Sequence, residues 1–301
     1  MAQQNILITG ACGFVGEFVV REFLERSDYI LHLNCRKGHT QETSPRIFLH
    51  RTDLSSAEQL KELFSKNRFH AVIHLSALAR LKEGESHPEE AYRVNFLNTK
   101  LLLRTAEHFR VQKFVFISSD LARNHKSVVG MTKFLSEADL MLSKRKSTQR
   151  VILRLPNIEW TPGSVHLIFR RLLDDHQPIT ITHPEMTRRF ISRTEAAAYI
   201  RCALELGNDK DLFVVNKPVV RITDLARQMM QERGMNVALK YIGRQPGEKL
   251  AEEAYKTVDI KSVDKGDLAL LIHSIPWERD RESVNKDLQE KLKEVNTEIK
   301  F

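Results

Sequence analysis

The fold of this chain is decided near its N-terminus, where the residues read Ile6-Leu7-Ile8-Thr9-Gly10-Ala11-Cys12-Gly13-Phe14-Val15-Gly16. The first four, mostly apolar, predict a buried strand, and a glycine loop of the form G-x-x-G-x-x-G follows at once. An apolar helix face comes next, made by Phe14, Val15, Phe18, Val19 and Phe23. A strand, a glycine turn and a helix in this order are typical of a site for the pyrophosphate of a dinucleotide.

Each glycine has its own task in such a site. Gly10 allows the tight turn, Gly13 lets the phosphates approach the backbone, and Gly16 lets the helix pack closely on the strand. The first N–H groups of the helix and the positive end of its dipole then face the phosphates. A structural glycine turn without a ligand is the simpler alternative, but the position directly after the first strand favours dinucleotide binding.

The composition is that of an ordinary globular protein. The 301 residues, 42% hydrophobic and 29% charged, suffice for one large domain or two merged lobes. No apolar run approaches the ~20 residues of a membrane helix, and Met1-Ala2-Gln3-Gln4 leads directly into the first strand, so we expect no membrane span and no signal peptide. Cys12, Cys35 and Cys202 lack metal-ligand spacing, and their odd number predicts a reducing cytoplasm without disulfides.

The net charge of +8 raises the question of nucleic-acid binding. The basic residues are scattered, however, and the one tight cluster, Lys144-Arg145-Lys146, follows a predicted helix, where a solvated cationic end is the simpler explanation. An anionic cofactor and a phosphate-bearing substrate account for part of the charge. We therefore expect no nucleic-acid partner.

Apolar runs alternate with helical patterns through the first half of the chain. Parallel strands covered on both sides are apolar on both faces, as in Ala71-Val72-Ile73-His74-Leu75. We predict strands near 5–9, 29–33, 46–49, 71–75, 113–118 and 151–155, and helices near 14–26, 57–66, 89–108 and 130–143. This pattern predicts an α/β fold with a doubly wound parallel sheet, a Rossmann fold, over residues 1–155.

After Pro156 the pattern changes, because proline and glycine become frequent and the predicted strands, 179–182 and 213–216, are short. We expect a smaller substrate lobe over 156–301, interleaved with late strands of the main sheet. Its end is one amphipathic helix, with apolar residues at spacings of 3 and 4: Val284, Leu288, Leu292, Val295 and Ile299. Packing on its own domain is the favoured role of this helix, and a subunit contact is the alternative.

Several motifs together resemble the extended short-chain dehydrogenases/reductases. They are the glycine loop, Asp53-Leu54 after the third strand, His74-Leu75-Ser76-Ala77 at the end of the fourth, and Asn95. Thr180-Ile181-Thr182-His183-Pro184-Glu185-Met186-Thr187-Arg188 is similar to the T-V-T-H-P-D-M-T-R segment of one subfamily. Arg154-Leu155-Pro156-Asn157-Ile158 resembles its R-F-G-N-V, and Gln245-Pro246-Gly247-Glu248-Lys249-Leu250 its R-P-G-E-K-L.

That subfamily comprises the UDP-N-acetylglucosamine 4,6-dehydratases and 5-epimerases of surface-polysaccharide pathways. The resemblance runs from about residue 4 to about residue 255. It implies a cytoplasmic enzyme, a homo-oligomer, that acts on a UDP-sugar. The cofactor site that it implies consists of Gly10, Gly13, Phe14, Gly16, Arg36, Lys37, Asp53, Leu54, Leu75, Ser76, Ala77, Asn95, Ser118 and Lys133.

The choice of cofactor is argued from charge. An acidic residue at the end of the second strand would bind the adenosine ribose and repel a 2′-phosphate. The chain reads Leu33-Asn34-Cys35-Arg36-Lys37 there, with two cations and no acid. Arg36 can hold a phosphate with its planar fork, and Lys37 adds a point charge. The sequence thus favours NADP over NAD, the alternative being that both cations lie in a solvated loop.

The catalytic segment of the family reads S-T-D-K-A-x-N-P and then N-x-[YM]-G-A-[TC]-K. This chain has Ser118-Ser119-Asp120-Leu121-Ala122-Arg123-Asn124-His125, then Ser127-Val128-Val129-Gly130-Met131-Thr132-Lys133. By resemblance, Asp120 is the acid, Lys133 holds the nicotinamide ribose, and Ser119 can bind the oxygen on carbon 4 of the sugar.

Two positions depart from the family pattern. Leu121 replaces the lysine that resembles a base, and Val129 replaces the tyrosine or methionine. His125 and Lys126 are the nearby candidates for the missing base. His125 is preferred because its ordinary pKa lies near neutral pH, although an exposed loop histidine is the simpler interpretation. For the substrate, the matched segments offer Asn157, Arg188, Arg244 and Glu248; the two arginines suit a diphosphate, and Arg188 could instead form a surface ion pair.

Three functions remain open on this evidence. The first is a nucleotide-sugar dehydratase or epimerase with an altered base. The second is an NADPH-dependent reductase or epimerase of a keto-sugar nucleotide, which needs less elimination machinery but still needs a proton donor. The third is a protein that binds NADP or a UDP-sugar without catalysis, which explains Leu121 and Val129 but leaves Asp120 and Lys133 without a purpose.

Overall fold

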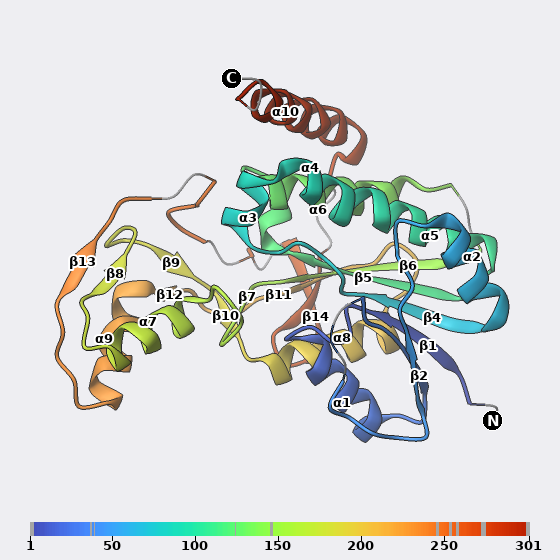
Figure 1. Cartoon of the computed structure of the whole chain (residues 1–301), viewed down its shortest axis with the longest axis horizontal. Coiled ribbons are helices and arrows are strands. Elements are labelled where there is room, and N and C mark those ends of the chain that lie inside the picture. The colour runs from blue at the N-terminus through green and yellow to red at the C-terminus, as the bar shows by residue number, and fades with distance from the viewer. Residues whose placement is uncertain are drawn as a thin grey trace.

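A parallel sheet with two antiparallel strands at one edge forms the centre of the molecule (Figure 1). The computed structural model describes residues 3–36, 38, 40–123, 125–144, 147–244, 247–252, 255–256, 259–271 and 275–298. In these residues the sheet has nine strands in the order β14-β15-β11-β6-β5-β4-β1-β2-β3. Their bounds are β1 (Asn5–Thr9), β2 (Ile30–Asn34), β3 (Ile47–His50), β4 (Phe69–His74), β5 (Lys113–Ser119), β6 (Gln149–Leu155), β11 (Leu212–Val215), β14 (Ile260–Lys265) and β15 (Leu268–Leu271).

The predicted fold class is confirmed. From β3 to β11 neighbouring strands pair in parallel, and β15 and β14 add antiparallel pairs at one edge. β1 has the predicted bounds, and the other five strands predicted in the first half of the chain differ by one or two residues at one or both ends. The chain winds outward from β1 in both directions, and the carboxyl ends of β1 and β4 meet where strand order reverses, the usual place for a ligand in such sheets.

Helices cover both faces of this sheet, as Figure 1 shows. α1 and α8 lie on one face, where Val19 and Ile200 pack with Ile6 of β1 in one apolar core. α2, α5 and α6 lie on the other, where Leu60 and Leu102 pack with Leu7. These helices are α1 (Gly16–Arg26), α2 (Ala57–Lys66), α5 (Asn98–His108), α6 (Val128–Leu142) and α8 (Arg193–Leu206).

The predicted helix 89–108 is divided into three pieces. α4 (Pro88–Tyr92) leads into a π-helical turn, η1 (Arg93–Leu97), and then into α5. A short helix that the sequence did not predict, α3 (Leu81–Ser86), precedes them. Single π-turns inside helices are frequent at functional sites, and this one carries Asn95.

Residues after Pro156 form a smaller unit and also return to the main sheet. α7 (Val165–Asp174) and α9 (Ile222–Glu232) pack around their own apolar core, which includes Phe169, Ile181 and Met229. Three two-stranded sheets accompany them: β7 (Asn157–Ile158) with β10 (Phe190–Ile191), β8 (Ile179–Ile181) with β13 (Leu239–Tyr241), and β9 (Thr187–Arg188) with β12 (Val220–Arg221).

The last helix, α10 (Trp277–Glu298), packs across α6 on the outside of the molecule (Figure 1). Val284 and Leu288 are buried in an apolar core with residues of α6 such as Phe134. The apolar face predicted for this helix therefore packs on its own chain as far as Leu292. Ile299 lies outside the described residues. None of the helices described is long and apolar enough to cross a membrane.

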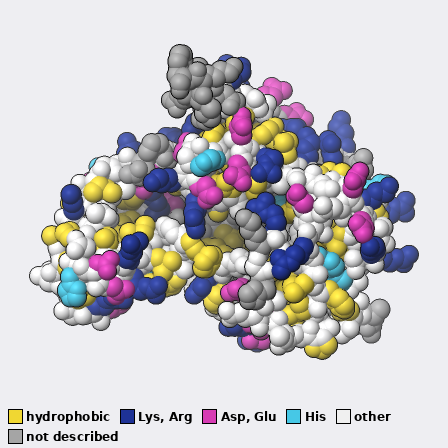
Figure 2. All heavy atoms as spheres, in the orientation of Figure 1, with side chains coloured by type: hydrophobic (Ala, Val, Ile, Leu, Met, Phe, Trp, Pro, Cys, Tyr) yellow, Lys and Arg dark blue, Asp and Glu magenta, His cyan; other side chains and the backbone are white. Residues whose placement is uncertain are grey.

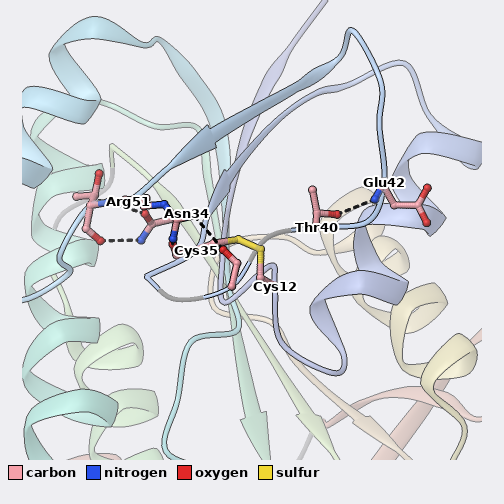
Figure 3. The surroundings of a disulfide bond; sticks show 8 residues. Cys12, Asn34, Cys35, Thr40, Glu42 and Arg51 are labelled. Carbon is pink, nitrogen blue, oxygen red and sulfur yellow. Dashed lines mark hydrogen bonds between the residues drawn. A yellow bond between two sulfur atoms is a disulfide. The ribbon is translucent and has the colours of Figure 1, made fainter.

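One expectation is wrong: Cys12 and Cys35 form a disulfide, with 5.5 Å between their Cα atoms (Figure 3). Parallel pairing of β1 with β2 places Thr9 opposite Asn34, so the residues that follow the two strands are neighbours although 23 positions separate the cysteines. Cysteine number and spacing could not reveal this contact. Cys202 is buried and is not part of a disulfide. The argument from free cysteines to a reducing cytoplasm therefore fails.

Candidate active site

The glycine loop lies where strand order reverses. At two of its glycines, neighbouring backbone atoms lie so close that no side chain would fit. Gly10 has a φ of +71°, and a Cβ there would lie 2.8 Å from the backbone nitrogen of Ser76, beyond β4. A Cβ on Gly16 would collide with the carbonyl oxygens of Gly10 and Ala11. Gly13 and Phe14 are exposed, so the turn offers backbone to a ligand at the point that the sequence predicted.

The end of β4 forms the second wall of this region. Leu75, Ser76 and Ala77 are partly exposed, and the Leu75 amide donates to the Thr9 carbonyl at 3.1 Å. Asn95 is fully buried behind them. Its amide pairs with both backbone groups of Leu78, at 2.8 and 2.9 Å, and donates to Thr132 Oγ1. The structure thus places Asn95 where it shapes the loop after β4 and ties it to α6.

The end of β2 carries the residues predicted to select the cofactor. Arg36 is exposed and lies in the electrostatic field of Asp53. Hydrogen bonds from Ser55 are the main cause that lowers the pKa of Asp53, and Arg36 contributes. Leu54 is buried beside them, whereas Lys37 lies outside the described residues. An exposed guanidinium near the disulfide and the glycine loop is thus available at the predicted place.

The predicted catalytic segment follows β5. Ser118 Oγ is buried and has no hydrogen-bond partner in the described part of the chain, and Ser119 Oγ accepts from the Leu121 amide at 3.3 Å. Lys133 comes from α6, where its Nζ donates to the Ile117 carbonyl at 2.8 Å. Burial lowers the pKa of Lys133 to about 8, so the ammonium is easier to deprotonate than an ordinary lysine.

Asp120 is the centre of a buried cluster that joins three distant parts of the chain. Its Oδ2 accepts from Arg189 Nη2 at 2.6 Å, and its Oδ1 accepts from the Tyr255 hydroxyl at 2.8 Å. Two guanidinium groups, of Arg123 and Arg189, lie 4.6 and 4.9 Å from the centre of the Tyr255 ring. Burial raises the pKa of Asp120, and the positive charge of Arg189 and the Tyr255 hydrogen bond oppose that shift.

A second buried ion pair lies beside this cluster. Arg154, at the end of β6, donates to both carboxylate oxygens of Glu137, with 2.8 Å between Nε and Oε1. Both side chains are almost completely buried, so each charge is compensated by the other. Arg154 also interacts with the Tyr255 hydroxyl. The carboxyl edge of β5 and β6 therefore carries Asp120, Arg154 and their partners as one polar network in an otherwise apolar sheet.

The two departures from the family pattern are packed into apolar surroundings. Leu121 packs on an apolar core that contains Val129. Val129 is buried against α3, where a Cβ on Gly84 would lie 2.5 Å from its Cγ2. His125 is partly buried, its ring centre is 4.4 Å from that of Phe134, and burial lowers its pKa. Asn124 lies outside the described residues.

Three of the four predicted substrate residues lie close together. Arg188 Nη2 lies 3.3 Å from Glu248 Oε1, and its Nε lies 3.8 Å from Glu252 Oε1. Asn157 Nδ2 donates to Glu252 Oε1 at 3.0 Å. The structure thus brings Asn157, Arg188 and Glu248 together, whereas Arg244 lies exposed on the segment after β13. Gln245 is outside the described residues.

Sequence reasoning missed four groups at this site. Arg189 directly follows Arg188 in a quoted motif, and its position there was a usable signal. Glu252 and Lys249 lie in or next to the matched Pro-Gly-Glu-Lys segment, and burial lowers the pKa of Lys249 to about 8. Tyr255 belongs to no motif, so only the tertiary contact with Asp120 reveals it.

The surface is hollowed between the smaller unit and the main sheet, and basic and acidic side chains are mixed over this face (Figure 2). No extended basic stripe crosses the visible surface.

Comparison with known proteins agrees with this architecture. A family model described as "Polysaccharide biosynthesis protein" matches residues 6–269. The capsular polysaccharide biosynthesis protein CapD of Staphylococcus aureus is 32% identical over 84% of this chain, which spans only 45% of CapD.

Solved structures show the same fold at low identity. DesIV, a dTDP-glucose 4,6-dehydratase from Streptomyces venezuelae with NAD and TYD bound, has a TM-score of 0.79 at 15% identity, over 94% of this chain and 96% of DesIV. The UDP-N-acetylglucosamine 4-epimerase of Methanobrevibacter ruminantium M1, in complex with UDP-N-acetylmuramic acid, has a TM-score of 0.74 at 18% identity, over 96% of this chain and 98% of that chain. Because the family model covers most of the chain and CapD is 32% identical, the chain belongs to the polysaccharide biosynthesis protein family.

Proposed function

We propose that the chain is an NADP-dependent nucleotide-sugar enzyme of the dehydratase or epimerase type. Its substrate in this proposal is a UDP-N-acetylhexosamine, from which a hydride is removed at carbon 4. The observation that supports this most directly is the buried Asp120, placed at the carboxyl end of β5 with Lys133 packed against the same strand. Two ionisable side chains, Asp120 and Lys133, are buried close to the point where strand order reverses, and a protein without a functional site there would not need them.

The residues present fit a nicotinamide dinucleotide. Gly10 and Gly16 leave no room for a side chain, and the exposed backbone of Gly13 suits a pyrophosphate. Arg36 suits a 2′-phosphate, which supports NADP, while the NAD bound to DesIV supports the nicotinamide cofactor in general. When bound, the cofactor would accept the hydride from the sugar.

The proposed chemistry assigns a role to each nearby side chain. Oxidation at carbon 4 makes a ketone that acidifies the proton on carbon 5. Asp120 would supply the proton with which the carbon 6 hydroxyl leaves as water. Ser119 would hold the oxygen on carbon 4, and Lys133 would orient the nicotinamide ribose. Both Asp120 oxygens accept one hydrogen bond here, from Arg189 and from Tyr255, and each oxygen keeps a further lone pair that can carry a proton.

Two residues with lowered pKa values, His125 and Lys249, are candidates for the base that replaces the family lysine. The His125 ring is held neutral by burial but packs on Phe134. Lys249 interacts electrostatically with Asp120 and Glu252, and its pKa of about 8 leaves a sizeable neutral fraction near pH 8. Lys249 is therefore the better candidate, and Lys249→Gln should lower turnover more than His125→Gln.

Diphosphate binding is proposed for Arg188 and Arg244, with Asn157 and Glu248 at the sugar end. Arg188 is already engaged by Glu248 and Glu252, so a diphosphate must displace at least one carboxylate. The UDP-sugar itself is inferred from the family and from the ligand of the archaeal epimerase.

The decisive experiment is incubation with UDP-N-acetylglucosamine and NADP⁺, followed by mass spectrometry of the nucleotide sugar. Loss of one water supports the dehydratase. Asp120→Asn is the matched variant; its turnover should fall by about 10²–10⁴-fold, with substrate affinity within a few-fold. Normal turnover in this variant would exclude the role of Asp120.

A reductase or epimerase of a keto-sugar nucleotide is a second candidate, favoured by the apolar packing of Leu121 and Val129. Turnover of a 4-keto sugar with NADPH, without loss of water from UDP-N-acetylglucosamine, would establish it. Binding of NADP or of the UDP-sugar without either reaction would leave a binding protein.

A further inference from the structure

We propose that Cys12 and Cys35 form a redox modification site that controls the affinity of the dinucleotide-binding loop. The disulfide joins the two structural parts that a dinucleotide would contact. Cys12 lies between Gly10 and Gly13 in the glycine turn, and Cys35 lies between Asn34, the last residue of β2, and Arg36. The proposal rests on the proposed function only in that the loop binds a dinucleotide.

The sulfur bridge leaves the loop accessible. Gly13 and Phe14 remain exposed with the disulfide formed, so backbone that would meet phosphates is not covered. Cys35 is only 4% exposed, and Cys12 is partly exposed. Figure 3 shows the bridge crossing from the glycine loop to the end of β2. The bridge therefore braces the loop and does not fill the proposed phosphate site.

The end of β2, Cys35 and Gly38 are held by a second set of contacts. Arg51 donates to the carbonyl of Cys35 at 3.5 Å and to that of Gly38 at 3.1 Å. Asn34 and Thr52 exchange two further hydrogen bonds, at 2.9 and 3.0 Å. The end of β2 is thus anchored on β3 and its continuation, and the disulfide extends this anchor to the glycine loop.

This arrangement determines the direction of the effect. A loop that is ordered before binding loses less conformational entropy when the ligand arrives, so the oxidised form should bind more tightly. Reduction breaks the covalent link between the glycine loop and the end of β2, which carries Arg36. The ligand must then order both segments when it binds. We expect roughly a three- to tenfold higher dissociation constant for NADP⁺ in the reduced protein.

The redox step is an ordinary thiol–disulfide exchange with a low-molecular-weight disulfide such as oxidised glutathione. The thiolate of Cys12, the more exposed cysteine, attacks one sulfur of the reagent and releases one glutathione thiolate. The Cys35 thiolate then attacks the mixed disulfide at Cys12 and releases the second. Two protein thiols are oxidised, one reagent disulfide is reduced to two thiols, and the two protons are taken up by the leaving thiolates.

The test compares the full chain after treatment with dithiothreitol and after treatment with oxidised glutathione. Alkylation and mass spectrometry count the free thiols of each form, and NADP⁺ and NAD⁺ are titrated calorimetrically. The oxidised protein should retain one thiol outside the disulfide, on Cys202, and should bind more tightly. Cys12→Ser and Cys35→Ser should each bind with the reduced affinity under both treatments, whereas Cys202→Ser should keep the full redox difference.

Equal affinities in the two forms, or weaker binding by the oxidised form, would overturn the proposal while the proposed function stands. Failure of oxidised glutathione to join Cys12 and Cys35 would overturn it as well. Absence of dinucleotide binding in both forms would overturn the proposed function together with this inference. The central comparison uses the unmutated protein, so it does not depend on the folding of a variant.

Discussion

Asp120 accepts hydrogen bonds from two residues that are 69 and 135 positions away in the sequence. A carboxyl at the end of a parallel strand would ordinarily face solvent or a ligand. Here Arg189 supplies a counter-charge and Tyr255 a neutral donor, so the protonation of Asp120 depends on both. At the scale of single residues, the protonation state of Asp120 is therefore influenced by groups outside the predicted catalytic segment.

Tyr255→Phe should raise the pKa of Asp120, because the hydroxyl that stabilises its charged form is removed while the ring remains. The limb of the pH–rate profile that reports Asp120 should move to higher pH, and unfolding should cost about 1 kcal/mol less. The profile is measured with the proposed substrate, UDP-N-acetylglucosamine. Tyr199→Phe is the control, since it removes a buried hydroxyl from α8; an equal shift in both variants would contradict the coupling.

Arg36→Asp should weaken NADP⁺ binding by about 2 kcal/mol, because one charge-assisted contact is lost and a repulsion is gained. NAD⁺, which lacks the 2′-phosphate, should be affected much less. Titration of both cofactors gives the comparison, and Arg21→Asp, on the exposed face of α1, controls for a general change in charge. Equal losses for NADP⁺ and NAD⁺ at position 36 would refute the assignment.

The glycine loop, at the scale of elements, is held by the approach of two strands and a helix. Gly10 touches the backbone after β4, and Gly16 sets the distance between α1 and the loop. Asn95, in the π-turn between α4 and α5, fixes the loop after β4 from the other side. The geometry of the proposed cofactor site is thus produced by three elements whose contacts all depend on small or polar residues.

Gly10→Ala should destabilise the protein by about 2 kcal/mol or more and abolish dinucleotide binding. The left-handed backbone alone costs an alanine about 1–2 kcal/mol, and the added Cβ would collide with Ser76. Gly234→Ala is the matched control, because Gly234 has a φ of +61° but no heavy atom within 4 Å of the added Cβ. Urea unfolding should show a clearly smaller loss for Gly234→Ala; equal losses would mean that the close approach to Ser76 is unimportant.

The whole molecule is stabilised by a polar contact through the centre of its sheet. His74, at the end of β4, is fully buried; its Nδ1 lies 2.6 Å from Thr9 Oγ1 and its Nε2 lies 2.8 Å from Thr99 Oγ1. Burial lowers the pKa of His74 to about 3, with a smaller contribution from Lys133. The imidazole is therefore neutral in the folded protein and links β1, β4 and α5.

Global stability should fall as the pH is lowered from 6.5 towards 3. In this window the unfolded chain protonates His74 and the folded protein does not, so each pH unit costs up to about 1.4 kcal/mol. His74→Asn should be less stable at pH 7 because contacts are lost, but it should lose about 2 kcal/mol less between pH 6.5 and pH 5. Urea unfolding at the two pH values tests this, and identical pH dependence in both proteins would exclude His74 as the source.

The sequence by itself determined the doubly wound sheet, the glycine loop and the family. These follow from local patterns: apolar runs define buried strands, and a glycine turn between a strand and a helix has few other uses. The same local evidence placed Asp120 and Lys133 in the catalytic segment and Arg36 at the end of the second strand.

Only the tertiary structure determined which residues from distant parts of the chain contact one another. Arg189 and Tyr255 reach Asp120 from segments that are distant along the chain. Cys12 reaches Cys35 because the parallel strands β1 and β2 bring their carboxyl ends to one edge of the sheet. It also divided the predicted helix 89–108 by a π-turn and tied Arg188 to two carboxylates. Motifs record residue types and local spacing, whereas charge compensation and cross-linking depend on distances that only the folded chain sets.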